Sequence, residues 1–520
     1  MNTLKCASLR RLVESFIGLK TKQTDTIFFY KNNVVKPSNI GMLGAWVSGG
    51  IEWCMIHHHR ASTFMPVDYH LQENPDGSKT IFIGETEPRH RMKWVIGLTV
   101  YPGKSYIETE VKLMNRTPLT NSFLYWANVA THVNEDYQVF FPPSTQYGVD
   151  HSKVDFTHWP ISHENYRGID YTKGVDISWW KNHPEPTSVF CYDLQEDFMG
   201  GYDHGKEAGT VHVAKHHIVK GAKLWEWGPG EEAQMWDKVL TDEDGPYAEI
   251  MVGGYSDNQP DYSWIRPYET KTLKQYWFPV KKIGGLKYAN LNGAVNMELK
   301  NEKTLFFGFH TTQKFEGAKV ILYHDGTPAF QQTIDIGPDK PFIHEMTMKR
   351  EMSFLKLKVA LFNNQGKELI IYQPVEKKYD PILPEVVTKP DSPENIKSVE
   401  ELYLTGLRIK QFHSPTLDAN DYFTEALNRD PGNSDVNTFL GFEALKNGQY
   451  DEAALRFRTA IKRISKDYTK PSKCEAFLGL GQVLKIKELY NAAIDTLYRC
   501  FMGLCSSFFI VSFFWQKYRA

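Results

Sequence analysis

The sequence predicts a multidomain protein that is mainly β up to residue 376 and all-α beyond residue 396. Two observations predict this fold class. Alternating apolar and polar runs, separated by turn sequences such as Asn-Pro-Asp-Gly, continue for most of the first 376 residues. A helical period with an internal repeat then begins. At 520 residues the chain is too long for one typical core, so several domains are expected.

Residues 1–280 are expected to form a large β-sandwich. Segments such as KTIFIGE, WVIGLTVYP and YIETEVKLMN alternate in the manner of half-buried strands, and no helical period persists among them. Residues 1–24 are the exception, because their apolar positions fit one short amphipathic helix. Many antiparallel strands in one long region favour a sandwich of two large sheets.

Residues 281–376 are expected to form a smaller, immunoglobulin-like β-sandwich. VILYHDG, FQQTIDIG, FLKLKVALFN and KELIIYQP are short strands at regular spacing. Residues 377–395 are rich in proline, which predicts a stiff, extended linker.

Residues 396–520 carry about three copies of a helical repeat that resembles the tetratricopeptide repeat. Small and large residues recur in triplets: Ala419, Phe423 and Ala426; Ala453, Phe457 and Ala460; Ala493, Leu497 and Cys500. Small residues let two antiparallel helices approach, and large ones fill the space between turns. The last copy runs into the apolar tail at residues 501–515, so either the array is cut short or the tail is a capping helix.

The overall composition disfavours some classes of function and is compatible with others. A net charge of -2 gives no electrostatic case for nucleic acid or an anionic membrane surface. The apolar tail is shorter than a spanning helix needs, and no secretory signal is evident, so a cytoplasmic location is expected. The six cysteines are scattered, which predicts reduced thiols and neither a metal site nor a cofactor. An aromatic content of 14% within a β-rich chain is compatible with carbohydrate contact.

Glu249 is the first candidate for a catalytic residue. It lies inside the apolar strand expected at residues 247–252, and carboxylates are rarely buried unless they are paired or functional. The loop that follows offers Asp257 and then Trp264, a mixture that suits the polar edges and apolar face of a sugar. The alternative is an edge-strand carboxylate that faces water beside an ordinary turn.

Other clusters of polar residues in the first domain are further candidates. Glu52 lies between apolar residues and precedes His58, His59 and Arg60. Adjacent histidines do not make a metal site by themselves, because alternate residues of a strand point to opposite faces. Glu226 lies between two tryptophans, where its pKa could rise to that of a proton donor. The remaining candidates are His90, Arg91, Trp126, Asn128, His132, Glu135 and Asp136.

The first 280 residues resemble the galactose mutarotase-like supersandwich. More closely, they are similar to an uncharacterised bacterial domain family that precedes tetratricopeptide repeats. The resemblance is carried by GMLGAWVSGGIEW, HHRASTFMPVDYH, NRTPLTNSFLYWANVATHVNEDYQVFFPPSTQY, YTKGVDISWWKNHP and GYDHGKEAGTVHVA. Members of this family carry further β sequence before this start, so the first domain is expected to be N-terminally incomplete.

The mutarotase resemblance implies that Glu249 is the base. Phe123 stands where such enzymes have the acid histidine, so His132, His90 or His59 would have to replace it, or the reaction would differ.

Three functions follow from these candidates. The first is a carbohydrate-processing enzyme, glycoside hydrolase-like, with Glu249 as base and Glu226, Glu52 or His132 as acid. The second is a noncatalytic glycan-binding scaffold whose repeats bind a protein partner. The third is a sugar epimerase.

Overall fold

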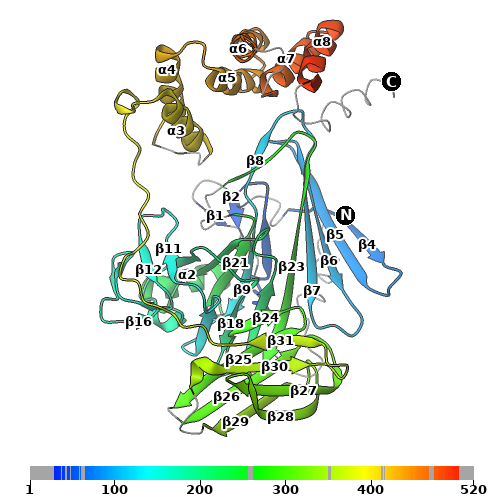
Figure 1. Cartoon of the computed structure of the whole chain (residues 1–520), viewed down its shortest axis with the longest axis vertical. Helices are drawn as coiled ribbons and strands as arrows, with labels where there is room; N and C mark the ends of the chain where they lie inside the picture. Colours follow the sequence, from blue (N-terminus) through cyan, green and yellow to red (C-terminus); the bar gives the residue numbers. More distant parts are fainter. Residues whose placement is uncertain are drawn as a thin grey trace. The chain divides into compact units, whose positions relative to one another are not determined.

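The structure of the chain is a computed structural model, shown in Figure 1. It describes residues 29–34, 36, 38–40, 44–46, 48–57, 59, 65–255, 262–301, 303–348, 353–411, 414, 416–467 and 473–502. The chain divides into two compact units. The first comprises the described parts of residues 1–114, 123–263 and 270–387, and the second those of residues 115–122, 264–269 and 388–520.

Two large antiparallel sheets form the main sandwich of the first unit. One sheet has eight strands in the order β10 (Tyr137–Phe140), β18 (Phe198–Asp203), β19 (Ala208–Val213), β23 (Thr270–Lys281), β7 (Ile107–Asn115), β6 (Met92–Val100), β5 (Lys79–Glu87) and β4 (Asp68–Glu73). The other has seven strands in the order β12 (Phe156–His158), β11 (Tyr147–Val149), β17 (Thr187–Cys191), β20 (Gly221–Glu226), β21 (Tyr247–Gly253), β9 (Trp126–His132) and β3 (Ile51–Cys54).

Side chains that cross between the two sheets hold the sandwich together. Thr131 Oγ1 of the seven-stranded sheet lies 2.8 Å from the hydroxyl of Tyr137 in the other sheet. The hydroxyl of Tyr125, just before β9, donates to Gln275 Oε1 of β23. The first unit also contains the shorter elements β1 (Ser38–Ile40), β2 (Gly44–Trp46), β13 (Ile161–Ser162), β14 (Asn165–Tyr166), β15 (Ile169–Asp170), β16 (Val175–Asp176), η2 (Trp180–Asn182) and α2 (Glu231–Thr241). The two short strands β8 (Asn121–Phe123) and β22 (Ser263–Ile265) pair with each other, and most of their residues belong to the second unit.

A second, smaller sandwich follows in the same unit, drawn in green to yellow in Figure 1. Its two four-stranded sheets are β24 (Tyr288–Asn290), β25 (Gly293–Asn301), β26 (Thr304–Thr311) and β29 (Phe342–Thr347), and β28 (Thr327–Ile336), β27 (Phe315–His324), β30 (Leu357–Phe362) and β31 (Glu368–Tyr372). The short helix η3 (Phe354–Lys356) precedes β30. Apolar residues that alternate along these strands fill the space between the sheets, as the sequence pattern predicts.

The segment after the small sandwich runs back over the large one. Lys377 Nζ donates to the carbonyls of Thr145 and Trp159. The amide of Val387 donates to the carbonyl of Lys153 at 2.8 Å. Residues 377–387 therefore belong to the first unit and are not a linker between units. We call this segment the strap.

The second unit contains a series of helices: η4 (Pro393–Asn395), α3 (Val399–Gln411), α4 (Ala419–Arg429), α5 (Ser434–Lys446), α6 (Tyr450–Ile464), α7 (Glu475–Ile486) and α8 (Tyr490–Met502). All nine residues of the three sequence triplets are buried. In the helix pairs α3–α4, α5–α6 and α7–α8, a glycine of the first helix lies against a large side chain of the second. At Gly441 of α5, for example, an added Cβ would lie 2.7 Å from the ring of Phe457. The structure thus confirms a helical array, while its assignment as tetratricopeptide repeats stays a prediction.

The chain is mostly β through residue 372 and helical from residue 399, as the sequence predicts. Among the described residues, no helix combines the length and apolar character that a membrane crossing requires. The amphipathic helix expected at residues 1–24 and the tail beyond residue 502 lie outside the described residues.

Candidate functional site

One face of the seven-stranded sheet gathers buried charged and polar side chains. Glu52 on β3 stands opposite Asn128 on β9, which stands opposite Met251 on β21, which in turn stands opposite Lys223 on β20. Paired residues of neighbouring strands point to the same face, and so do residues two apart on one strand. Glu249 therefore shares this face, which we call the carboxylate face.

Glu52 is the best-anchored member of the carboxylate face. Its carboxylate lies 3.0 and 3.1 Å from Nδ1 of His59 and accepts a 3.0 Å hydrogen bond from Nδ2 of Asn128. Cys54 Sγ lies 3.6 Å from the same His59 nitrogen. Glu52, Cys54 and Asn128 are all buried, and His59 keeps only a small exposed part. Burial lowers the pKa of His59, but the neighbouring Glu52 outweighs this effect and the net pKa is raised.

Lys223 is the cation of this face. Its Nζ lies 3.0 Å from Nε2 of His151, whose Nδ1 lies 2.6 Å from the hydroxyl of Ser188. The ammonium also lies 4.9 Å from the ring centroid of Phe190 and 5.5 Å from that of Trp225. Burial lowers the pKa of Lys223 to about 7, against the opposing pull of the nearby Glu249.

Aromatic rings frame the polar groups of the carboxylate face. The ring of Trp126 lies edge-on to that of His59, with centroids 5.6 Å apart. Trp225 lies edge-on to His151 in the same way, at 6.1 Å. A surface of this kind offers hydrogen-bond donors and acceptors beside flat apolar walls.

Several residues predicted from the sequence therefore meet on one face of one sheet: Glu249, Glu52, Asn128, Trp126 and His59. Glu249 is 6% exposed and Glu52 is 5% exposed, so neither is the solvent-facing edge carboxylate of the alternative interpretation.

Glu226 lies on the opposite face of the sheet. It pairs with Ala248, next to the Trp225–Glu249 pair, so its side chain points between the two large sheets. It is fully buried, and burial raises its pKa well above the usual value. His183 Nε2 lies 3.4 Å from Glu226 Oε1 but donates to the carbonyl of Ile177 at 2.6 Å. Burial lowers the pKa of His183 to about 4, so this imidazole is neutral at pH 7.

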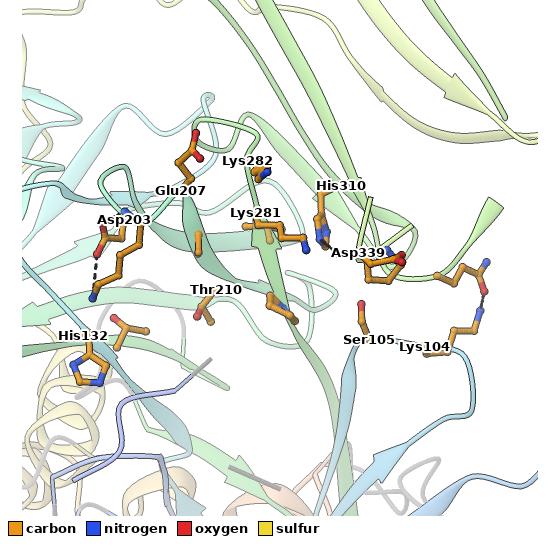
Figure 2. A pocket seen from close by; sticks show the side chains of 18 of the residues that line it. Lys104, Ser105, His132, Asp203, Glu207, Thr210, Lys281, Lys282, His310 and Asp339 are labelled. Carbon is orange, nitrogen blue, oxygen red and sulfur yellow. Dashed lines mark hydrogen bonds and ion pairs between the residues drawn. The ribbon is translucent and has the colours of Figure 1, made fainter. Parts of the chain in front are cut away.

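His132 lines a separate cavity, shown in Figure 2. This cavity has a volume of about 960 Å³ and lies between the end of the large sandwich and the small sandwich. Thr210, Lys281, His310 and Asp339 also line it. By register His132 points to the carboxylate face, because it pairs with Tyr247, two residues from Glu249. It lies at the end of β9, with its ring centroid 4.5 Å from that of Tyr30, and neither Glu52 nor Lys223 lines its cavity.

The other predicted residues are spread over the molecule. His90 and Arg91 lie in the turn between β5 and β6, where His90 Nδ1 is 3.1 Å from Glu87. Glu135 and Asp136 are exposed in the turn between β9 and β10. Trp264 is exposed and belongs to the second unit. His58, Arg60 and Asp257 lie outside the described residues.

The sequence interpretation missed Lys223, His151 and Cys54. Alternation could have found two of them, since Cys54 is two residues from Glu52, and Lys223 is an odd number of residues from Glu226. The sequence around His151 did not mark it as a site residue. It follows β11 and is far from Lys223 in the sequence, so only the folded chain brings the two side chains together.

Two family models match the β part of the chain. The family model described as a domain of unknown function, DUF5107, matches residues 2–280, and the model described as the second domain of YphG-like proteins matches residues 288–372.

Similar solved structures are distant. A TPR-domain containing protein from Parabacteroides distasonis is 17% identical, with a TM-score of 0.45, over 94% of this chain and 67% of that one. A putative aldose 1-epimerase from Klebsiella pneumoniae is 9% identical, with a TM-score of 0.31, over 41% and 54%. A galactose mutarotase related enzyme from Lactobacillus acidophilus is 11% identical, with a TM-score of 0.29, over 41% and 71%.

Proposed function

The chain belongs to the family described as DUF5107, and we propose that its carboxylate face binds a sugar and processes it at the anomeric carbon, with Glu249 as the general base. The observation that carries this proposal is the burial of two carboxylates, Glu249 and Glu52, on one face of one sheet among aromatic rings.

The chemistry of a sugar matches the groups on this face. Hydroxyl groups donate to carboxylates and accept from an amide or an ammonium, which Asn128 and Lys223 supply. Apolar faces of a pyranose pack on aromatic rings, which the half-buried Trp225 supplies.

The geometry favours epimerase-like proton transfer over two-carboxylate hydrolysis. Hydrolysis needs one carboxyl group that stays protonated and donates to the leaving oxygen. Glu226 has the raised pKa for that role but lies on the other face of the sheet. Glu52 lies on the same face as Glu249, but its carboxylate is already engaged by a hydrogen bond from Asn128 and by Nδ1 of His59 at 3.0 Å. Glu249 is thus assigned to remove the proton of the anomeric hydroxyl. The C1–O5 bond breaks as the C1 carbonyl forms, the ring oxygen takes a proton from water, and the reverse steps reclose the ring on either face.

Anomer interconversion of free aldoses, followed by NMR, tests the proposal. The wild-type chain is compared with Glu249→Gln across a panel of hexoses and pentoses, with aryl glycosides in parallel to detect hydrolysis. Loss of a general base lowers the rate by about 10²–10⁴-fold. Glu226→Gln is the matched control, because it removes a buried carboxyl from the opposite face and is expected to keep the activity.

Equal rates for wild type and Glu249→Gln on every sugar would refute the catalytic proposal. Release of aryl alcohol that depends on Glu249 would favour hydrolysis instead. Sugar binding without turnover would leave the noncatalytic scaffold, in which the helical unit binds a protein partner.

A further inference from the structure

Three side chains of the carboxylate face present metal-ligating atoms to one point. Cys54 Sγ, His59 Nδ1 and the carboxylate of Glu52 all lie within 4.8 Å of one another. Glu52 and Cys54 are two residues apart on β3, so the strand places them on the same face. His59 comes from the segment after β3, which folds back over that face.

The distances match those of a tetrahedral zinc site. Zinc bonds of about 2.3 Å to sulfur and about 2.0–2.1 Å to nitrogen and oxygen place S and N roughly 3.6 Å apart, and N and O roughly 3.3 Å apart. The observed separations are 3.6 Å for Cys54 and His59, and 3.0 Å for His59 and Glu52.

A second observation points to a missing ligand at this place. Asn128 is 3% exposed and donates from Nδ2 to Glu52 Oε2. Its Oδ1 is buried and has no hydrogen-bond partner within the part of the chain that the structure describes. Buried polar atoms are normally satisfied, so this oxygen is available to accept a hydrogen bond from a metal-bound water.

We propose that Glu52, Cys54 and His59 bind one Zn²⁺ ion, with an open fourth position that faces the substrate. Thiolate, imidazole and carboxylate are all zinc ligands, and three protein ligands with one open position are typical of catalytic rather than structural zinc. Asn128 orients the Glu52 carboxylate from outside the coordination shell.

The role of this zinc in catalysis rests on the proposed function. There the ion polarises a sugar oxygen, which replaces the acid histidine whose place Phe123 occupies. Zinc binding itself needs no sugar, so it is measured without one.

Metal content of the full-length chain tests the site directly. The reduced protein is stripped with a chelator, reloaded with Zn²⁺ or Co²⁺, and freed of excess metal. One zinc per chain is expected by elemental analysis, and the Co²⁺ form is expected to show a thiolate-to-cobalt charge-transfer band. Cys54→Ser removes that band and weakens zinc binding by more than about 100-fold, while Asn128→Ala weakens it by about 10–100-fold.

Cys191→Ser is the matched control, because Cys191 is an equally buried cysteine of the same sheet whose Sγ lies against Thr145. It is expected to bind zinc like the wild type. Absence of bound metal after reloading, or a charge-transfer band that survives Cys54→Ser, overturns the proposal. If Cys54→Ser fails to fold, the wild-type Co²⁺ spectrum decides alone, since a band without sulfur character refutes thiolate ligation.

The two proposals fail separately. If the chain binds zinc but converts no sugar, the metal-site proposal stands and the proposed carbohydrate function is refuted. A chain that turns over sugar through Glu249 but binds no metal loses the zinc and keeps the function.

Discussion

Glu226 is the residue whose burial has the clearest consequence for stability. Its carboxyl is fully buried, and neither oxygen has a hydrogen-bond partner within the described residues. Burial raises the pKa of this carboxyl well above its usual value of 4.5, so the folded state holds a proton that the unfolded state releases. Stability is therefore lost as the pH rises above about 4.5, at about 1.4 kcal/mol per pH unit until the folded pKa is reached.

Glu226→Gln cannot ionise, so we expect it to be more stable than the wild type at pH 7.5 and to lose this advantage at pH 4.5. Urea unfolding of both proteins across this pH range, followed by tryptophan fluorescence, measures the difference. A constant difference at all pH values would mean that the carboxyl is already ionised in the folded state.

His310 gives the opposite pH dependence in the small sandwich. It is 2% exposed, and burial lowers its pKa from 6.5 to about 4. The folded state therefore excludes a proton that the unfolded state takes up below pH 6.5, and stability falls as the pH drops from 6.5 to 4, by about 3 kcal/mol in total. In thermal unfolding, His310→Gln is expected to reduce the loss of stability between pH 6.5 and 4. His324→Gln, at a turn of the same sandwich, is expected to leave that loss unchanged.

At the scale of single residues, alternation predicts which side chains share a face but not which face. Lys223 and Glu226 must point to opposite sides of any strand from residue 221 to 226. That Glu249 joins Lys223 rather than Glu226 depends on the pairing of β20 with β21, where a shift of one residue would reverse the result. We expected Glu226 to act with Glu249 because the register between two strands cannot be predicted from the local sequence of either strand.

At the scale of elements, the helical pairs depend on close contacts between glycine and aromatic rings. The ring of Phe457 on α6 lies against Gly441 on α5 and Gly479 on α7, where an added Cβ would sit 2.7 and 2.2 Å away. The ring is held from both sides and cannot move aside. Gly441→Ala is therefore expected to destabilise the array by about 1–3 kcal/mol, although alanine favours helix by about 1 kcal/mol.

Thermal unfolding followed by helical circular dichroism measures this effect. The double variant Gly441→Ala with Phe457→Leu is expected to be less destabilised than the sum of the two single changes, because the smaller side chain makes room for the methyl group. An unchanged or raised melting temperature for Gly441→Ala alone would contradict the tight packing.

The repeat triplets predicted this packing because helix contacts are local in sequence. The spacing of Ala453, Phe457 and Ala460 is enough to predict which face of their helix is buried. The carboxylate face could not be predicted in this way. It joins β3 to β9 and β9 to β21, strands separated by long stretches of chain, and no local pattern specifies which strands become neighbours.

At the scale of the first unit as a whole, the strap connects the small sandwich back to the large one through His158. This residue is 6% exposed, and its Nδ1 lies 2.5 Å from Glu164 Oε1 while its Nε2 lies 2.7 Å from the carbonyl of Asp380. Its ring also stacks on Tyr379 with centroids 4.4 Å apart. Composition predicted a stiff, extended linker at residues 377–395, since proline content reports on backbone stiffness and not on docking partners.

His158→Ala removes the stacking and the bond to Asp380, so we expect the strap to open more often. A loss of about 1–3 kcal/mol raises the open population roughly 5- to 150-fold. Chymotrypsin cleavage after Tyr379 reports that population, because a protease needs the backbone locally unfolded. His163→Ala is the control, since His163 is exposed and only its edge touches Tyr379. Equal cleavage rates for both variants would show that His158 does not hold the strap, and that Lys377 and Val387 suffice.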